Sequence, residues 1–96
     1  MADQRPFQVR QAILETLANS YPGGRGIDRL LLGADIQPLG VSREELLREA
    51  RVLEAAEFLV DLKPRLEPHW KITFEGMCQI RREKTPDEVV WGESAL

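Results

Sequence analysis

The chain has 96 residues, of which 43% are hydrophobic and 30% charged, so it is long enough for one small globular domain and too short for two. The net charge of -3 excludes the general basic excess of a nucleic-acid coat protein, so any DNA contact requires a local cationic patch. A single cysteine, Cys78, excludes an intrachain disulfide and a multi-cysteine zinc site, which suits a reducing cytoplasm. The sequence also has neither an apolar run of membrane-spanning length nor a signal-peptide core at its start, which predicts a cytoplasmic protein.

Two helices are expected in the first 40 residues. Apolar residues recur at helical spacing from Phe7 to Leu17 and predict a helix over residues 7–20, which Pro22 and two glycines end. A second, shorter helix is expected over residues 26–36, where Ile27 and Leu30 have the same period and a glycine weakens the pattern.

Residues 41–59 have the clearest helix start in the chain. Ser42 and Glu45 have the spacing of a capping box, in which each side chain accepts the free backbone N–H of the other residue. The helical period separates two faces over this stretch. One face, expected to pack, has Leu46, Leu47, Ala50 and Leu53, and the opposite face has Glu44, Arg48, Arg51 and Ala55.

The pattern changes to strand-like alternation after residue 59. Residues 60–62 and 70–73 predict two short strands joined by a charged turn over residues 64–68, with Trp70 and Ile72 on the buried side. Thr73 is placed to cap a last helix over residues 74–84. The prediction is therefore one mostly α domain with a small β-hairpin over residues 1–84, and an irregular or docking tail over residues 85–96.

This order of elements resembles the winged helix-turn-helix family, and more narrowly the small winged-helix proteins of Mu-like prophages. The resemblance rests on VSREELLREARVLEAAEFLV, the hairpin after it, and WKITFEGMCQIRRE, including the step from Thr73 to Gly76. It implies a three-helix core, a two-stranded wing and a C-terminal helix, with the third helix offered to DNA. Relatives usually have a glycine between the third helix and the wing. We align that position with Phe58, where a left-handed backbone would be unfavourable.

The candidate DNA contacts on the third helix are Arg43, Arg48 and Arg51, because arginine binds both phosphates and base edges. Acidic residues are interspersed with them, so the same face could instead be a solvated surface with pairs such as Glu44 to Arg48. The hairpin adds Lys63, Arg65 and Lys71, which could lie along phosphates or serve only solubility.

The resulting hypothesis is a phage-type transcriptional regulator or accessory factor that binds duplex DNA, with the third helix in the major groove and the hairpin on the flanking backbone. A homodimer would supply two half-sites. The alternative is a winged-helix module that binds another protein, which the net charge of -3 favours. Between residues 42 and 84, nine Lys or Arg residues balance nine Asp or Glu residues. Val90 and Trp91 in the apolar tail are the candidate partner-binding residues.

Catalytic chemistry is not expected. His69 is the only histidine, predicted beside Trp70 in the hairpin, and Cys78 is predicted to be a buried hydrophobic residue of the last helix. The sequence contains no activated nucleophile, phosphate-binding loop or convincing acid/base pair. We therefore expect no enzyme, cofactor, metal site, small-molecule substrate or membrane partner.

Overall fold

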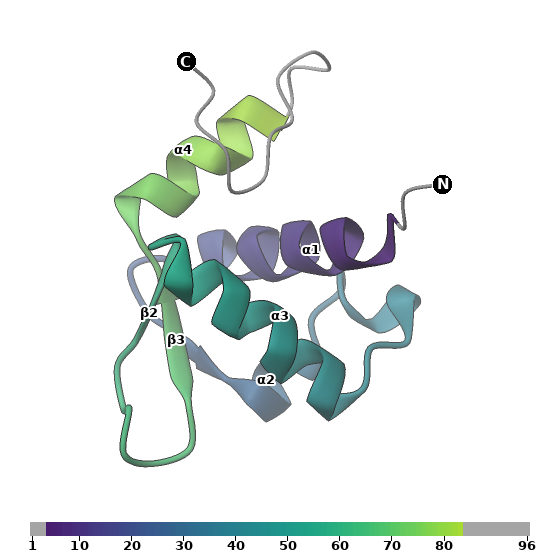
Figure 1. Ribbon diagram of the computed structural model, residues 1–96, viewed down its shortest axis with the longest axis horizontal. Coiled ribbons are helices and arrows are strands. Elements are labelled where there is room, and N and C mark those ends of the chain that lie inside the picture. The colour runs from purple at the N-terminus through teal and green to yellow at the C-terminus, as the bar shows by residue number, and fades with distance from the viewer. Residues whose placement is uncertain (1–3, 84–96) are drawn as a thin grey trace.

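The computed structural model describes residues 4–83, with side chains up to Ile80, as a mostly α-helical domain with a small antiparallel sheet (Figure 1). The elements are α1 (Arg5–Ser20), β1 (Arg25–Gly26), α2 (Ile27–Leu31), the 3-10 helix η1 (Gln37–Leu39), α3 (Arg43–Ala55), β2 (Leu59–Asp61), β3 (His69–Ile72) and α4 (Phe74–Glu83). The strand order in the sheet is β1-β3-β2, and both pairings are antiparallel. The mostly α prediction with a hairpin is confirmed; the third strand was not predicted.

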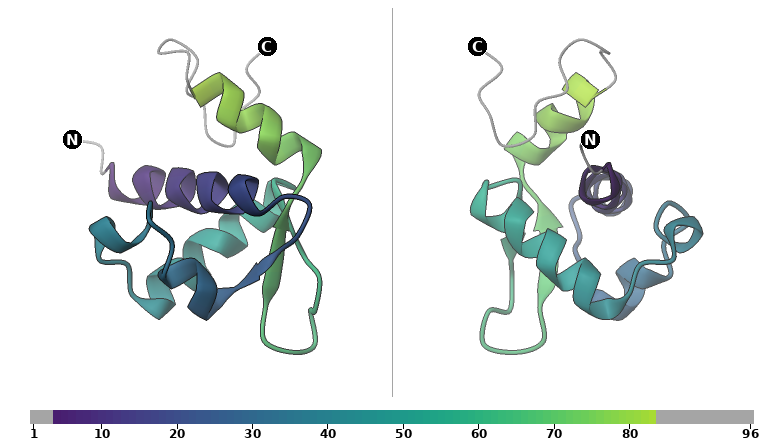
Figure 2. Two further views of the ribbon diagram at one scale, coloured as in Figure 1. Left: turned by 180° about the vertical axis from the view of Figure 1, so that it is seen from behind. Right: turned by 45° about the vertical axis from the view of Figure 1, so that its right-hand side comes forward.

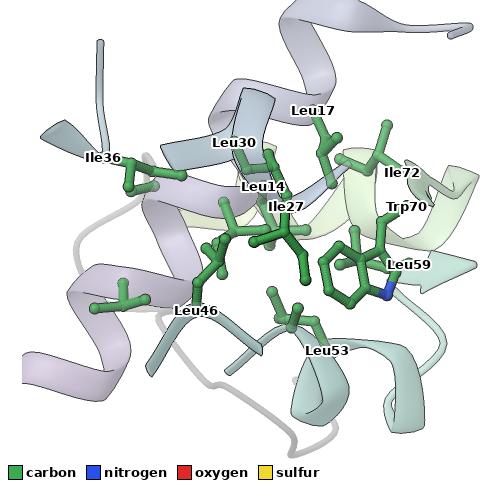
Figure 3. Packing of buried hydrophobic residues seen from close by; sticks show 14 of the residues in the cluster. Leu14, Leu17, Ile27, Leu30, Ile36, Leu46, Leu53, Leu59, Trp70 and Ile72 are labelled. Atoms are coloured by element: carbon green, nitrogen blue, oxygen red, sulfur yellow. The ribbon is translucent and has the colours of Figure 1, made fainter. Parts of the chain in front are cut away.

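Helix α1 lies between α4 on one side and α2 with α3 on the other, while the β2–β3 hairpin extends away from α4 (Figures 1 and 2). One apolar core joins these elements, and Figure 3 shows its side chains converging from the helices and the sheet. Its most buried large residues are Val9, Ile13, Leu14, Leu17, Leu30, Ile36, Leu46, Leu53, Trp70 and Ile72.

Helix α3 begins as the sequence predicts. Ser42 is the N-cap, and its hydroxyl accepts the backbone N–H of Glu45 at 3.0 Å. The Glu45 carboxylate makes the reciprocal contact of the capping box, because it accepts the backbone N–H of Ser42. Its two oxygens also bind the guanidinium of Arg5 in α1 at 2.7 and 2.8 Å. The N-terminus of α3 is therefore fixed both by its own cap and by the first turn of α1.

The second helix is much shorter than predicted, since α2 ends at Leu31 and not at residue 36. Gly33 lies against α1 so closely that a Cβ there would be 3.1 Å from the side chain of Thr16. The backbone then turns, with the N–H groups of Ile36 and Gln37 both donating to the carbonyl of Gly33. Ile36 is nevertheless 1% exposed. The apolar spacing over residues 26–36 thus reflects burial in the core, because the loop after α2 buries Ile36 without being helical.

The unpredicted strand β1 pairs with β3 through Arg25 opposite Trp70 and Gly26 opposite His69. Gly24 makes this approach possible, because a Cβ there would be 2.5 Å from the carbonyl oxygen of Trp70. A strand of two residues in a glycine-rich stretch shows no alternation, so the sequence pattern had no means of indicating it.

The predicted hairpin is confirmed, with β2 starting at Leu59, one residue earlier than expected, and β3 spanning His69–Ile72. Leu59 lies opposite Ile72, and Asp61 lies opposite Trp70. Trp70 and Ile72 are both fully buried, as predicted from the alternation.

Thr73 joins the sheet to α4 and caps that helix as predicted. Its hydroxyl accepts the N–H of Gly76 at 3.1 Å and donates to the carbonyl of Glu57 at 2.7 Å. A Cβ at Gly76 would be 2.4 Å from the carbonyl oxygen of Phe58, so only glycine allows α4 to start so close to the end of α3. The turn that follows α3 is therefore packed against the turn between β3 and α4.

The left-handed residue after α3 is Glu57, with a φ of 69°, and not Phe58 as we aligned it. The N–H of Phe58 donates to the carbonyl of Leu53, and the N–H of Glu57 donates to the carbonyl of Glu54, both at 2.9 Å. These two bonds form a Schellman motif, in which the residue with positive φ is usually glycine. The helix therefore ends in a motif that favours glycine, but with a glutamate in the strained position.

Replacing Glu57 with glycine is expected to stabilise the protein by about 1 kcal/mol, because glycine adopts the left-handed conformation without the steric cost of a Cβ. Urea unfolding of the wild type and Glu57→Gly measures the difference. Glu57→Ala, which keeps the Cβ, is the control and should show no such gain. Equal gains in both variants would attribute the effect to loss of the carboxylate.

Two ion pairs tie α1 to α3. Arg5 binds Glu45, and the Arg10 Nε donates to Glu49 Oε1 at 2.6 Å. The hydrogen bond from Arg5 lowers the pKa of the Glu45 carboxyl below its usual value, and burial opposes this only in part. The Glu49 side chain is only 4% exposed, so its charge depends on Arg10 and on a longer contact with Arg48 at 3.4 Å.

Arg10→Met is expected to destabilise the fold by about 2–3 kcal/mol, because it leaves the Glu49 carboxylate buried with one weak partner. The double variant Arg10→Met/Glu49→Leu removes the stranded charge and should recover most of that loss. Chemical denaturation of the two single variants and the double variant measures the coupling. If the losses in the free energy of unfolding of the two single variants simply add in the double variant, Arg10 and Glu49 do not stabilise the fold as a pair.

Candidate nucleic-acid interface

The outward face of α3 is the surface that the sequence predicted. Glu44, Arg48, Arg51 and Ala55 are all exposed, whereas Leu46, Ala50 and Leu53 are buried. Leu47 is half-buried. Arg48 and Arg51 thus lie on the outer side of α3, and Arg43, its first residue, lies at the N-terminal end of the helix.

Arg51 has a structural role at the junction of α3 with the sheet. Its Nη1 donates to Glu54 Oε1 at 2.7 Å and to Asp61 Oδ2 at 3.4 Å. Its guanidinium also lies over the indole of Trp70, 5.7 Å from the ring centroid. Since Trp70 Nε1 donates to the same Glu54 oxygen at 3.3 Å, these four residues form one connected cluster.

Asp61 holds the base of the hairpin. Its side chain is 3% exposed, and its Oδ1 accepts the N–H groups of Lys63 at 2.9 Å and His69 at 3.2 Å. Burial alone would raise the pKa of this carboxyl, but the two N–H groups and Arg51 outweigh it and lower the pKa below its usual value. The ionised carboxylate therefore closes the start of the hairpin loop.

Arg48 is the least engaged of the three helix arginines. Its side chain is 66% exposed, and among the described residues it forms an ion pair with Glu49 at 3.4 Å, which Arg10 already binds more closely. Arg43 is engaged through both of its terminal nitrogens, by Asp28 of α2 and by Glu67 of the hairpin loop. Of the three, Arg48 can therefore contact a ligand with the smallest loss of internal contacts.

The predicted hairpin cations divide into two kinds. Lys63 and Arg65 are exposed in the β2–β3 loop, and within the described part of the chain neither forms an ion pair. Lys71 lies on the outer face of β3, where its Nζ is 5.5 Å from the ring centroid of Tyr21. The loop cations are thus on the hairpin tip, and Lys71 is on the face of the sheet.

The remaining candidates contribute little to a site. His69 is half-buried beside Trp70 at the start of β3, as expected. Cys78 is half-buried and not fully buried as predicted. Among the described residues, no group of three His, Cys, Asp or Glu side chains could hold a metal ion.

Val90 and Trp91, the candidate partner-binding residues, lie outside the described residues. None of the helices within residues 4–83 combines the length and apolar character needed to cross a bilayer.

A shallow groove of about 380 Å³ lies between α1 and the segment before α3. Its lining residues are Gln8, Gln11, Ala12, Glu15, Asp35 and Leu39. It contains two carboxylates and no cationic side chain, so it is electrostatically opposite to the α3 arginines and separate from them.

Comparisons with models of known protein families, with curated proteins and with solved structures gave no match to this chain.

Sequence reasoning missed the acidic partners of the helix arginines. Asp28 is 15 residues and Glu67 is 24 residues from Arg43 in the chain, so spacing along one helix could not indicate either contact. The Arg51 to Asp61 contact likewise depends on how β2 turns back after α3. In contrast, the exposed position of Arg48 follows directly from the helical period.

Asp61→Asn is expected to destabilise the protein at neutral pH by about 1–2 kcal/mol, because a neutral amide accepts the same hydrogen bonds more weakly. Since the pKa of Asp61 is lower in the folded state, its contribution is present above the ordinary value of 3.8 and disappears as the pH falls through the folded-state value. Urea unfolding at about pH 7 and about pH 3 should show the two proteins converging at the acid end. A difference that stays constant with pH would argue against a charge effect.

Proposed function

We propose that this protein is a winged helix-turn-helix protein that binds duplex DNA, as a regulator or accessory factor of the prophage type. The order of helix, short strand, helix, helix, hairpin and helix supports this assignment. The proposal also draws on the outward face of α3 and on a hairpin that extends from the body beside it (Figure 1).

The observation that carries the proposal is a set of three exposed cations, Arg48, Lys63 and Arg65, that the fold itself uses little. They lie on α3 and on the hairpin loop, the two elements that would face DNA in a winged helix. The contact between Arg43 and Glu67 supports this arrangement, because it brings the start of α3 and the hairpin loop to the same side of the domain.

In the proposed complex, α3 enters the major groove and Arg48 contacts a phosphate or a base edge. Lys63 and Arg65 lie along the flanking phosphates. Arg51 acts mainly by holding the hairpin against α3. Residues 4–83 have twelve Lys or Arg residues and twelve Asp or Glu residues, so a single copy has little electrostatic attraction for DNA. A second copy on an adjacent half-site would compensate for this.

Protein binding is the second candidate function, and exposed apolar residues of the hairpin favour it. Val60, Leu62 and Leu66 are 42%, 49% and 72% exposed. Burial of such side chains against a partner depends little on salt, whereas phosphate contacts release counterions and weaken steeply as salt rises. Salt dependence therefore separates the two candidates.

The test is fluorescence anisotropy of a labelled random-sequence duplex at about 50 and 200 mM salt. If three or four phosphates are contacted, affinity should fall roughly 40- to 150-fold between the two salt concentrations. Arg48→Ala should weaken binding several-fold at the lower salt, and Lys63→Ala/Arg65→Ala should reduce the slope of affinity against salt.

Gln8→Glu is the matched control, because it changes the net charge by the same amount as Arg48→Ala but lies in the groove on α1. It should leave binding almost unchanged. Folded protein that binds no duplex at the lower salt would overturn the DNA proposal and leave protein binding as the better explanation of the exposed hairpin.

A further inference from the structure

Arg43 joins three elements at the end of the domain where DNA is proposed to bind. Its Nη1 donates to Asp28 Oδ1 of α2 at 2.8 Å, and its Nη2 binds Glu67 Oε2 in the β2–β3 loop. Arg43 is itself the first residue of α3. A single guanidinium therefore connects both helices of the helix-turn-helix pair with the hairpin.

All three side chains of this cluster are open to solvent, with exposed fractions of 50% for Arg43, 79% for Asp28 and 60% for Glu67. Exposed ion pairs contribute little to stability, because water screens them and because ordering the side chains costs entropy. The fold does not require this cluster in the way it requires the buried Arg10 to Glu49 pair.

The two carboxylates bind the two terminal nitrogens that Arg43 would offer to DNA end-on. A guanidinium binds a phosphate, or the O6 and N7 of guanine, through pairs of N–H donors. While Asp28 and Glu67 hold Nη1 and Nη2, a ligand that pairs with both terminal nitrogens must displace both acids, and any anionic ligand must overcome their repulsion of its negative charge. The acids and DNA thus compete for the same atoms.

We propose that Asp28 and Glu67 set the selectivity of the DNA site by covering Arg43, so that Arg43 binds only DNA that offers it a better acceptor than both carboxylates. This inference rests on the proposed DNA-binding function. Random-sequence DNA displaces the acids rarely, and its affinity stays low. A target sequence that presents well-placed acceptors displaces both acids and gains the Arg43 contact.

The experiment uses Asp28→Asn/Glu67→Gln in the full chain. These amides keep the size of the side chains and can still accept a hydrogen bond, but they lose the charge. Affinity for a random-sequence duplex at about 50 mM salt should rise roughly 3- to 10-fold, as expected for replacing two exposed ion pairs. In an Arg43→Gln background the same two substitutions should give a much smaller gain. Circular dichroism and thermal unfolding check that each variant is folded.

Glu15→Gln/Asp35→Asn is the matched control. It also removes two negative charges and keeps the size of the side chains, but both residues line the α1 groove, away from the outward face of α3 and from Arg43. Its effect on affinity should be small and should be the same with Arg43 or Gln at position 43. A gain in Asp28→Asn/Glu67→Gln that is lost without Arg43, and that the control does not show, would support the inference.

Four results would overturn the inference. A gain that persists in full without Arg43 would show a general charge effect. A loss of affinity in Asp28→Asn/Glu67→Gln would show that the acids orient the hairpin. If the wild type binds DNA and Asp28→Asn/Glu67→Gln binds it equally well, the inference is wrong but the proposed function stands. If neither the wild type nor any variant binds DNA, the proposed function is wrong as well.

Discussion

The position of Trp70 is the constraint on which the other elements depend. Its indole is fully buried, and its backbone lies in the central strand of the sheet between Arg25 of β1 and Asp61 of β2. Its one polar atom is satisfied by Glu54 of α3, and Arg51 lies over its ring. A buried aromatic residue with a satisfied N–H thus determines how the hairpin lies against α3.

The elements that the sequence predicted well are those with a periodic pattern and a local stop signal. Ser42 capped α3 as expected, and the alternation around Trp70 identified its buried side. The predictions failed where tertiary contact replaced local pattern. Gly33 ends α2 early because the chain there packs on Thr16, and β1 forms because Gly24 can approach the backbone of Trp70. Neither contact is visible from neighbouring residues in the sequence.

The candidate site was predictable in its position but not in its chemistry. The helical period identified the outward face of α3, including Arg48 and Arg51. It could not distinguish an arginine that is available to a ligand from one that the fold employs, since that difference depends on residues such as Asp61 and Glu67. The exposure of Lys63 and Arg65 was easier to predict, because both lie in a hairpin loop and loops run over the surface.

The packing of Gly76 against Phe58 has a mechanical consequence. Thr73 binds Glu57 through its hydroxyl and Phe58 through its N–H, so the end of β3, the start of α4 and the end of α3 meet at one junction. The hairpin and α4 extend from this point in opposite directions (Figure 2). A force that tilts the hairpin would therefore also displace α4, because both elements extend from this junction.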